Sequence, residues 1–187
     1  LKEYSILDSL PEKEYDDITF LASEICQAPV SMVTLIDEKR QWFKSHYGVE
    51  AQETEREIAF CAHAINNPEN IMVVPDSRMD ERFQKTPLVL NDPNVVFYAG
   101  VPLVNPDGYA LGTLCVIDNK PNALNELQIR ALKALSRQVM KLFELRKNSS
   151  VLKKTVHELE AKNRGLDEFV RVAAHDIKSP LASITMM

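Results

Sequence analysis

The sequence predicts an α+β fold, in which an antiparallel sheet flanked by helices is followed by one long helix. Apolar runs over residues 96–104 and 109–117 are separated by Asn-Pro-Asp-Gly at 105–108, a strong signal for a tight hairpin turn. A tight turn joins antiparallel strands, so parallel β-α-β winding is disfavoured. No proline occurs between Pro121 and Pro180, and residues 122–179 hold a single glycine, as expected for a long helix.

Hydrophobic periodicity predicts the elements that precede this hairpin. Apolar residues recur at helical spacing in the first of them, whereas β-branched and apolar residues dominate the run after Pro29. The expected elements are a helix over 15–27, strands over 30–37 and 41–47, a short helix over 57–66, a strand over 71–74, and a loop with a helical turn or two over 77–94. After the hairpin, Asn125 is expected to cap a helix that starts at Glu126.

Length, composition and charge exclude several classes of protein. With 187 residues, of which 45% are hydrophobic and 26% charged, the chain can form one globular domain with an appendage. Residues 1–118 carry 9 Lys and Arg against 20 Asp and Glu, whereas residues 119–187 carry 13 against 7, so an acidic unit precedes a basic one. Acidic residues are interleaved in the basic part, so we expect a solvated helix surface and no nucleic-acid partner.

Other patterns bear on cofactors and location. No GxGxxG or GxxxxGK[ST] motif occurs, which argues against a glycine-rich phosphate loop. No run of about 20 apolar residues is present, so no membrane span is expected. Cys26, Cys61 and Cys115 are widely spaced, which suits a reducing compartment, and a cytoplasmic location is therefore expected.

Five short motifs resemble those of one domain family. In order, they are FCAHAI (60–65), VPDSR (74–78), DERF (80–83), FYAGVPL (97–103) and LGTLCVID (111–118). Their order and spacing resemble a GAF domain over roughly residues 1–145. The resemblance implies an antiparallel sheet of about six strands with helices on both faces, and a module that senses a small molecule or another signal. We expect its core to span residues 1–124.

The same resemblance implies a ligand pocket between the sheet and the loop helices. Aromatic side chains commonly line such pockets, so Phe60, His63, Phe97 and Tyr98 are the candidate lining residues. Residues of these types are more often ordinary core residues. The GAF ligand itself stays unknown, and no cofactor is expected in this part of the protein.

A seven-residue repeat runs through the long helix. With Leu135 at position a, ten of the fourteen a and d positions up to residue 180 are apolar, and Leu fills four successive d positions. This period predicts a signalling helix over 125–168 that forms a parallel coiled-coil homodimer, with Asn163 at an a position fixing register and dimer state. The alternative is one long amphipathic helix that folds back on the domain.

The last part of the helix resembles a second family motif. His175, Asp176, Ser179, Pro180 and Leu181 match the phosphoacceptor box of histidine kinases, H-[DE]-x-x-[STN]-P-L. The resemblance implies that His175 accepts phosphate, that Asp176 orients the imidazole as a general base, and that Ser179 assists dephosphorylation. Residues 169–187 are then the start of the dimerisation and phosphotransfer helix of a kinase bundle.

These matches together predict the sensor portion of a bacterial two-component histidine kinase. The parent protein is expected to be a protein-histidine kinase, whose ATP and Mg belong to a kinase domain outside the 187 residues, so that this portion is inactive alone. Its expected partners are a second copy of the chain, a response regulator and an unknown small-molecule or other signal.

Two alternatives to this function stay open, and the cysteines bear on one of them. Some GAF domains reduce free methionine sulfoxide with a cysteine nucleophile, and Cys61 and Cys115 are the plausible pair here. The other alternative is a purely structural dimerising sensor module without chemistry at His175. Cys61 and His63 supply only two residues of a metal set, so no metal is expected. No cysteine is directly followed by histidine, which argues against a covalent bilin.

Overall fold

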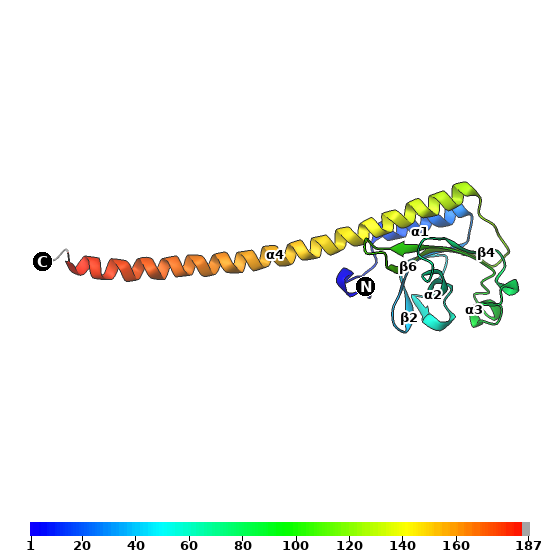
Figure 1. Cartoon of the computed structure of the whole chain (residues 1–187), viewed down its shortest axis with the longest axis horizontal. Helices are drawn as coiled ribbons and strands as arrows, with labels where there is room; N and C mark the ends of the chain where they lie inside the picture. The colour runs from blue at the N-terminus through cyan, green and yellow to red at the C-terminus, as the bar shows by residue number, and fades with distance from the viewer. Residues whose placement is uncertain (185–187) are drawn as a thin grey trace. The chain divides into compact units, whose positions relative to one another are not determined.

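The computed structural model describes the backbone of residues 1–184 and the side chains of residues 1 and 3–171. It confirms an α+β fold built on a six-stranded antiparallel sheet with strand order β3-β2-β1-β6-β5-β4 (Figure 1). The strands are β1 (Val30–Ile36), β2 (Arg40–Tyr47), β3 (Glu53–Glu55), β4 (Met72–Val74), β5 (Phe97–Val104) and β6 (Ala110–Asp118). The helices are η1 (Lys2–Tyr4), α1 (Lys13–Cys26), η2 (Arg56–Ile58), α2 (Phe60–Ala64), η3 (Ser77–Met79), α3 (Pro87–Leu90) and α4 (Glu126–Ile184).

The predicted hairpin joins β5 to β6. Gly108 has a φ of 86° and its N–H donates a hydrogen bond to the Asn105 carbonyl, so the turn needs a residue without Cβ at this position. β6 then pairs with β1, which places β1 and β6 at the centre of the sheet. Six of the seven residues of β1 and six of the nine of β6 are buried, because layers of helix and loop cover both faces of the sheet.

One face of the sheet packs against α1 and the first turns of α4. The shared core includes Tyr15 and Ala22 from α1, Leu114 from β6, and Leu132 and Phe143 from α4. These two helical segments lie side by side over the sheet in Figure 1. The start of α4 is therefore an integral part of the domain core.

The N-terminus of α4 is capped by Asn125, as the sequence predicted, and the structure shows that the cap is reciprocal. The Gln128 N–H donates to Asn125 Oδ1 at 3.0 Å, and the Asn125 N–H donates to Gln128 Oε1 at 3.0 Å. This arrangement satisfies two backbone N–H groups that the helix leaves without intrahelical partners. It sets the point at which the chain leaves the sheet and becomes helix.

The opposite face of the sheet carries a second core under the short helices. Phe60 and Cys61 of α2 and Phe83 of the following loop pack against Tyr98 of β5 and Cys115 of β6. The rings of Phe60 and Phe83 stack with centroids 4.0 Å apart, and those of Phe60 and Tyr98 lie 5.2 Å apart. This side of the domain therefore has irregular segments held by aromatic contacts.

The chain divides into two compact units, Leu1–Glu144 and Leu145–Met187. Within the second unit, the large apolar side chains that the structure describes are exposed. They are Leu145, Val151, Leu152, Val156, Leu159, Leu166, Phe169 and Val170. Pairing of this helix with a second copy stays a prediction, as do the boundaries 125–168 and 169–187. Among the described residues, no helix combines the length and apolarity that crossing a membrane requires.

Candidate functional site

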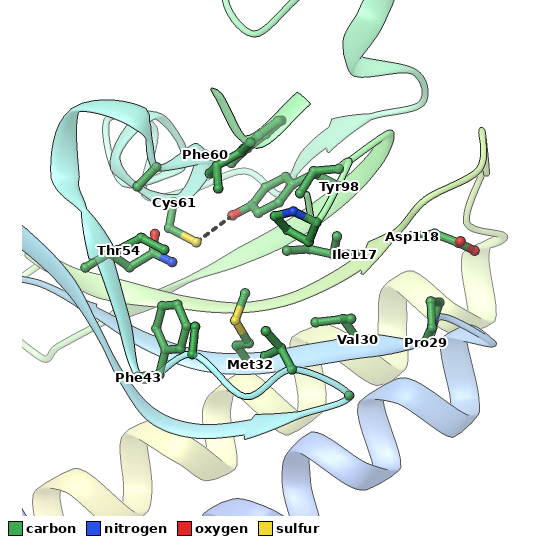
Figure 2. A pocket seen from close by; sticks show the side chains of 18 of the residues that line it. Pro29, Val30, Met32, Phe43, Thr54, Phe60, Cys61, Tyr98, Ile117 and Asp118 are labelled. Atoms are coloured by element: carbon green, nitrogen blue, oxygen red, sulfur yellow. Dashed lines mark hydrogen bonds between the residues drawn. The ribbon is translucent and has the colours of Figure 1, made fainter. Parts of the chain in front are cut away.

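A cavity of about 660 Å³ lies on the face of the sheet that is covered by α2 and α3. Its wall combines residues of β1, β2, β3, β5 and the end of β6 with α2, the loop at 48–51, and the segment 88–95 that includes part of α3. Figure 2 shows Phe60 and Tyr98 on one side of this space and Met32 and Phe43 on the other. A volume of this order is typical of pockets that hold small organic ligands.

Tyr98 reaches the cavity because Gly100 leaves room for its ring. A Cβ at position 100 would lie 2.0 Å from Tyr98 Oη, so a larger residue there would displace the phenol. Tyr98 is fully buried, and its hydroxyl donates a hydrogen bond of 3.3 Å to Cys61 Sγ (Figure 2). The aromatic wall is thereby tied to a buried thiol.

Cys61 and Cys115 form a close thiol pair behind this wall. Their Sγ atoms lie 3.8 Å apart, and the two residues are 1% and 0% exposed. Burial raises the pKa of Cys61, but hydrogen bonds, above all that with Cys115, outweigh burial and lower it to about 7. The pKa of Cys115 is raised well above its ordinary value by its hydrogen bond to Cys61 and by burial. Cys61 is therefore the thiol of this pair that ionises first, and it lines the cavity.

Two polar side chains of the cavity wall lack hydrogen-bond partners. In the described part of the chain, neither Gln41 Oε1 nor Thr54 Oγ1 has one, although both atoms are buried. Gln41 of β2 is paired with Thr54 of β3 in the register of the sheet. Directly opposite residues in an antiparallel pair have adjacent side chains on the same face. Both residues belong to the cavity wall, but the two oxygen atoms themselves are buried within it.

The charge around the cavity is negative. Glu50, Asp92 and Asp118 are among its lining residues, and none of the described lining residues is Lys, Arg or His. Glu50 and Asp92 are exposed, whereas Asp118 is half-buried and accepts a hydrogen bond from the Lys120 N–H. This composition favours a neutral or cationic occupant over an anionic one.

The four residues predicted to line a pocket fall in three places. Phe60 and Tyr98 line the cavity. His63 is exposed on α2, its ring 4.9 Å from that of Phe83, and is not among the cavity-lining residues. Phe97 is fully buried on the opposite face of the sheet, in the core with α1 and α4. A role in ligand contact stays a prediction for all four.

The sequence reasoning did not identify Gln41 or Thr54. A glutamine within an otherwise buried strand was an available signal, because polar residues inside proteins are normally hydrogen-bonded. Thr54 gave no signal, because β3 itself was not predicted. No group of three or more His, Cys, Asp or Glu that could hold a metal is found among the residues that the structure describes. The side chains of His175, Asp176 and Ser179 lie outside the described residues.

Comparison with known proteins identifies the domain and several relatives. The GAF domain family matches residues 11–142. The chain is 34% identical over 139 residues to a cyclic di-GMP phosphodiesterase of Pseudomonas aeruginosa. The aligned region covers 74% of this chain but only 24% of that protein.

Two solved structures are similar in fold. One is a domain assigned to a two-component sensor histidine kinase of Sinorhizobium meliloti, with a TM-score of 0.62 at 15% identity, covering 76% of this chain and 97% of that one. The other is the free methionine-R-sulfoxide reductase of Neisseria meningitidis, with a TM-score of 0.59 at 14% identity. This match covers 79% of this chain and 87% of the reductase. At these identities the similarity shows the fold alone.

These comparisons correct the predicted function. The prediction of the sensor portion of a protein-histidine kinase, with His175 as its phosphoacceptor, is contradicted by the curated relative, which is a cyclic di-GMP phosphodiesterase. The prediction rested on a five-residue match in a helix, and the GAF fold carries no information about the chemistry of the whole protein. One fold serves a kinase, a reductase and a phosphodiesterase among these relatives. What the sequence motifs and the 132 matched residues do establish is that the chain belongs to the GAF domain family.

Proposed function

We propose that this GAF domain is a small-molecule-binding regulatory module that works as a homodimer. The observation that carries the proposal is the cavity of about 660 Å³, whose aromatic wall includes Phe60 and Tyr98. A cavity of this volume with an apolar and aromatic lining is typical of small-molecule sites.

The position of the cavity suits a regulatory role. Its wall includes the loop at 48–51 and the segment 88–95, which a bound ligand would contact. The central strands connect it to the other layer of the domain. Cys115 of β6 lies in the core beneath the cavity, whereas its neighbour Leu114 packs in the core shared with α1 and the start of α4. A ligand that favours one arrangement of the sheet would thereby bias the start of α4.

The second half of α4 supplies the proposed dimer contact. Four successive leucines at d positions, from Leu145 to Leu166, are between 55% and 64% exposed in the single chain. A parallel pairing with a second copy would bury this stripe, and Asn163 at an a position would select two strands in register. The first turns of α4 belong to the domain core, where Leu132, Val139 and Phe143 are buried.

The size of the curated relative is consistent with a regulatory role. The chain spans 24% of that phosphodiesterase, so the matched region is one module of a larger protein. We expect such a module to be controlled by ligand and not to carry the phosphodiesterase chemistry itself. The predicted cytoplasmic location is compatible with this role and stays a prediction.

Thermal shift measurements with a metabolite panel test the proposal. At least one compound should raise the melting temperature of the wild-type protein, because binding to the native state stabilises it by mass action. The same compound should have no effect on Val49→Trp, in which an indole replaces a half-buried cavity-lining side chain. A shift of equal size in both proteins would contradict binding in this cavity.

A further inference from the structure

Two buried cysteines of the domain lie close enough to react with each other. Cys61 belongs to α2 and Cys115 to the central strand β6, and their Sγ atoms are 3.8 Å apart. A disulfide requires about 2.05 Å between its sulfur atoms, so bond formation needs an approach of about 2 Å. Because α2 has only five residues, rotation of the two side chains with a small shift of this helix can supply that approach.

The two thiols differ in their reactivity. Burial raises the pKa of Cys61, but hydrogen bonds with Cys115 and with nearby hydroxyl groups outweigh burial and lower the pKa to about 7. The hydroxyl groups are those of Thr113, Thr34 and Tyr98. The pKa of Cys115 is instead raised well above its ordinary value by its hydrogen bond to Cys61 and by burial. Because the thiolate is the nucleophile, Cys61 reacts first with an oxidant, and Cys115 remains as the thiol that resolves the product.

The third cysteine of the chain is kept apart from this pair. Cys26 packs in the core on the opposite face of the sheet, with α1 and the start of α4, whereas Cys61 and Cys115 share the core under the short helices. Burial raises the pKa of Cys26 to about 11, so it stays a thiol at neutral pH. An intramolecular disulfide in this chain therefore has one available arrangement, between residues 61 and 115.

Burial of the pair selects the class of oxidant. Cys61 and Cys115 are 1% and 0% exposed, so an oxidant reaches their sulfur atoms only when the segments that cover them open locally. The covering helices α2, η3 and α3 have five, three and four residues, so each can open without unfolding of the sheet. A small neutral hydroperoxide can enter through such openings, whereas a protein disulfide is too large to reach either sulfur.

We propose that Cys61 and Cys115 form a peroxide-sensitive dithiol, which a small hydroperoxide oxidises to an intramolecular disulfide. In the first step the Cys61 thiolate attacks the hydroperoxide. An S–O bond forms, the O–O bond breaks, and hydroxide or alkoxide leaves and takes up a proton. In the second step Cys115 Sγ attacks the sulfenic acid on Cys61. An S–S bond forms, the S–O bond breaks, and the thiol proton leaves with the hydroxyl group as water.

The electrons balance over the two steps, because the two thiols lose two electrons and the hydroperoxide gains them. The disulfide also consumes the Cys61 thiol to which the Tyr98 hydroxyl is hydrogen-bonded (Figure 2), so oxidation changes the aromatic wall of the cavity. This modification is separate from the proposed ligand binding and does not depend on it.

A count of free thiols by mass spectrometry tests the modification. Reduced wild-type protein is treated with hydrogen peroxide, unfolded, and labelled with N-ethylmaleimide. Untreated protein should take up three labels, one for each cysteine, and the oxidised protein a single label on Cys26. Peptide mapping without reductant should then find the peptides of Cys61 and Cys115 linked within one chain. Cys26→Ser is the matched control and should form the same link.

Two further variants test the order of the steps. In Cys115→Ser no resolving thiol remains, so Cys61 should stop at the sulfenic acid and be trapped by dimedone. In Cys61→Ser the remaining Cys115 should give at least about tenfold less dimedone adduct. Circular dichroism that matches wild type shows that these variants are folded, and the label count of the wild type does not depend on them.

Two results would overturn the dithiol. They are three labels on peroxide-treated wild-type protein and a disulfide that involves Cys26. Equal dimedone adducts in Cys115→Ser and Cys61→Ser would overturn the assignment of Cys61 as the residue that reacts first. Each of these results would leave ligand binding in the cavity standing.

Discussion

The hydroxyl of Tyr98 donates a hydrogen bond of 3.3 Å to Cys61 Sγ, joining the aromatic wall of the cavity to a buried cysteine pair. A donor of this kind favours the thiolate over the thiol. Burial is the largest influence raising the pKa of Tyr98, and the charge of Cys61 raises it further, so the phenol keeps its proton while the thiol loses its own.

Replacement of this donor should make Cys61 less acidic. In Tyr98→Phe the thiolate loses one hydrogen bond, so the pKa of Cys61 should rise above the value of about 7 in the wild type. The rate of alkylation of Cys61 by iodoacetamide, followed by mass spectrometry against pH, should have its midpoint near that value in wild type and at higher pH in the variant. Cys26 is an internal reference, because burial raises its pKa to about 11. Identical midpoints in Tyr98→Phe and wild type would refute this role of Tyr98.

Gly100 should be intolerant of a methyl group. In Gly100→Ala the new Cβ would lie 2.0 Å from Tyr98 Oη, so the phenol must move and its bond to Cys61 must break. We expect a loss of about 1–3 kcal/mol in the free energy of unfolding, measured by urea denaturation. Gly165→Ala is the matched control, because no atom lies within 4 Å of a Cβ there and alanine favours helix. Equal stability of Gly100→Ala and wild type would contradict the close approach.

The first turns of α4 should be essential to the stability of the domain. Phe143 is fully buried, and its ring centroid lies 5.6 Å from that of Tyr15 and 6.1 Å from that of Tyr4. Phe143→Ala should lower the free energy of unfolding by about 3–5 kcal/mol. Leu127→Ala on the same helix removes a side chain that is 73% exposed and should have little effect. Similar losses in the two variants would mean that α4 does not complete the core.

The contact surface of the proposed coiled coil, formed by its a and d positions, can be tested with two separate variants that each introduce one negative charge. Leu159→Asp puts a carboxylate at a d position and should convert a dimer to a monomer in sedimentation velocity at tens of micromolar. Ala161→Asp puts the same charge at the outward f position and should leave the dimer intact. Asn163→Leu should raise the melting temperature and permit other oligomers, because a polar a residue lowers stability and selects dimers. A monomeric wild type, or a dimer in Leu159→Asp, would contradict pairing through this helix.

The parts of the fold that were predictable are those specified by local signals. The 105–108 turn with Gly108 and the cap at Asn125 were both anticipated, because turn and cap residues act within a few positions of themselves. β3 was not anticipated. Two of its three residues, Glu53 and Glu55, are of a type depleted in strands, and the segment becomes a strand by pairing with the edge of β2.

The candidate site was less predictable for a related reason. Phe97 and Tyr98 are adjacent in β5, so they point to opposite faces, and at most one of them can reach a given cavity. Both faces of this sheet are buried, so hydrophobicity could not show which face holds the cavity. The pairing of Gln41 with Thr54 depends on the unanticipated β3, and the lowered pKa of Cys61 depends on Cys115, 54 positions away. The motif around His175 was misleading because a short helical pattern does not determine the activity of a protein that contains a GAF domain.

The most direct measurement is native mass spectrometry of the protein purified from its own host. The account predicts a non-covalent adduct that is released on denaturation, at one copy per chain, and that is absent from Val49→Trp protein whose circular dichroism matches wild type. The mass of the released compound should correspond to a molecule without net negative charge. Wild-type protein that carries no adduct and gains none from a host metabolite extract would contradict ligand binding in this cavity.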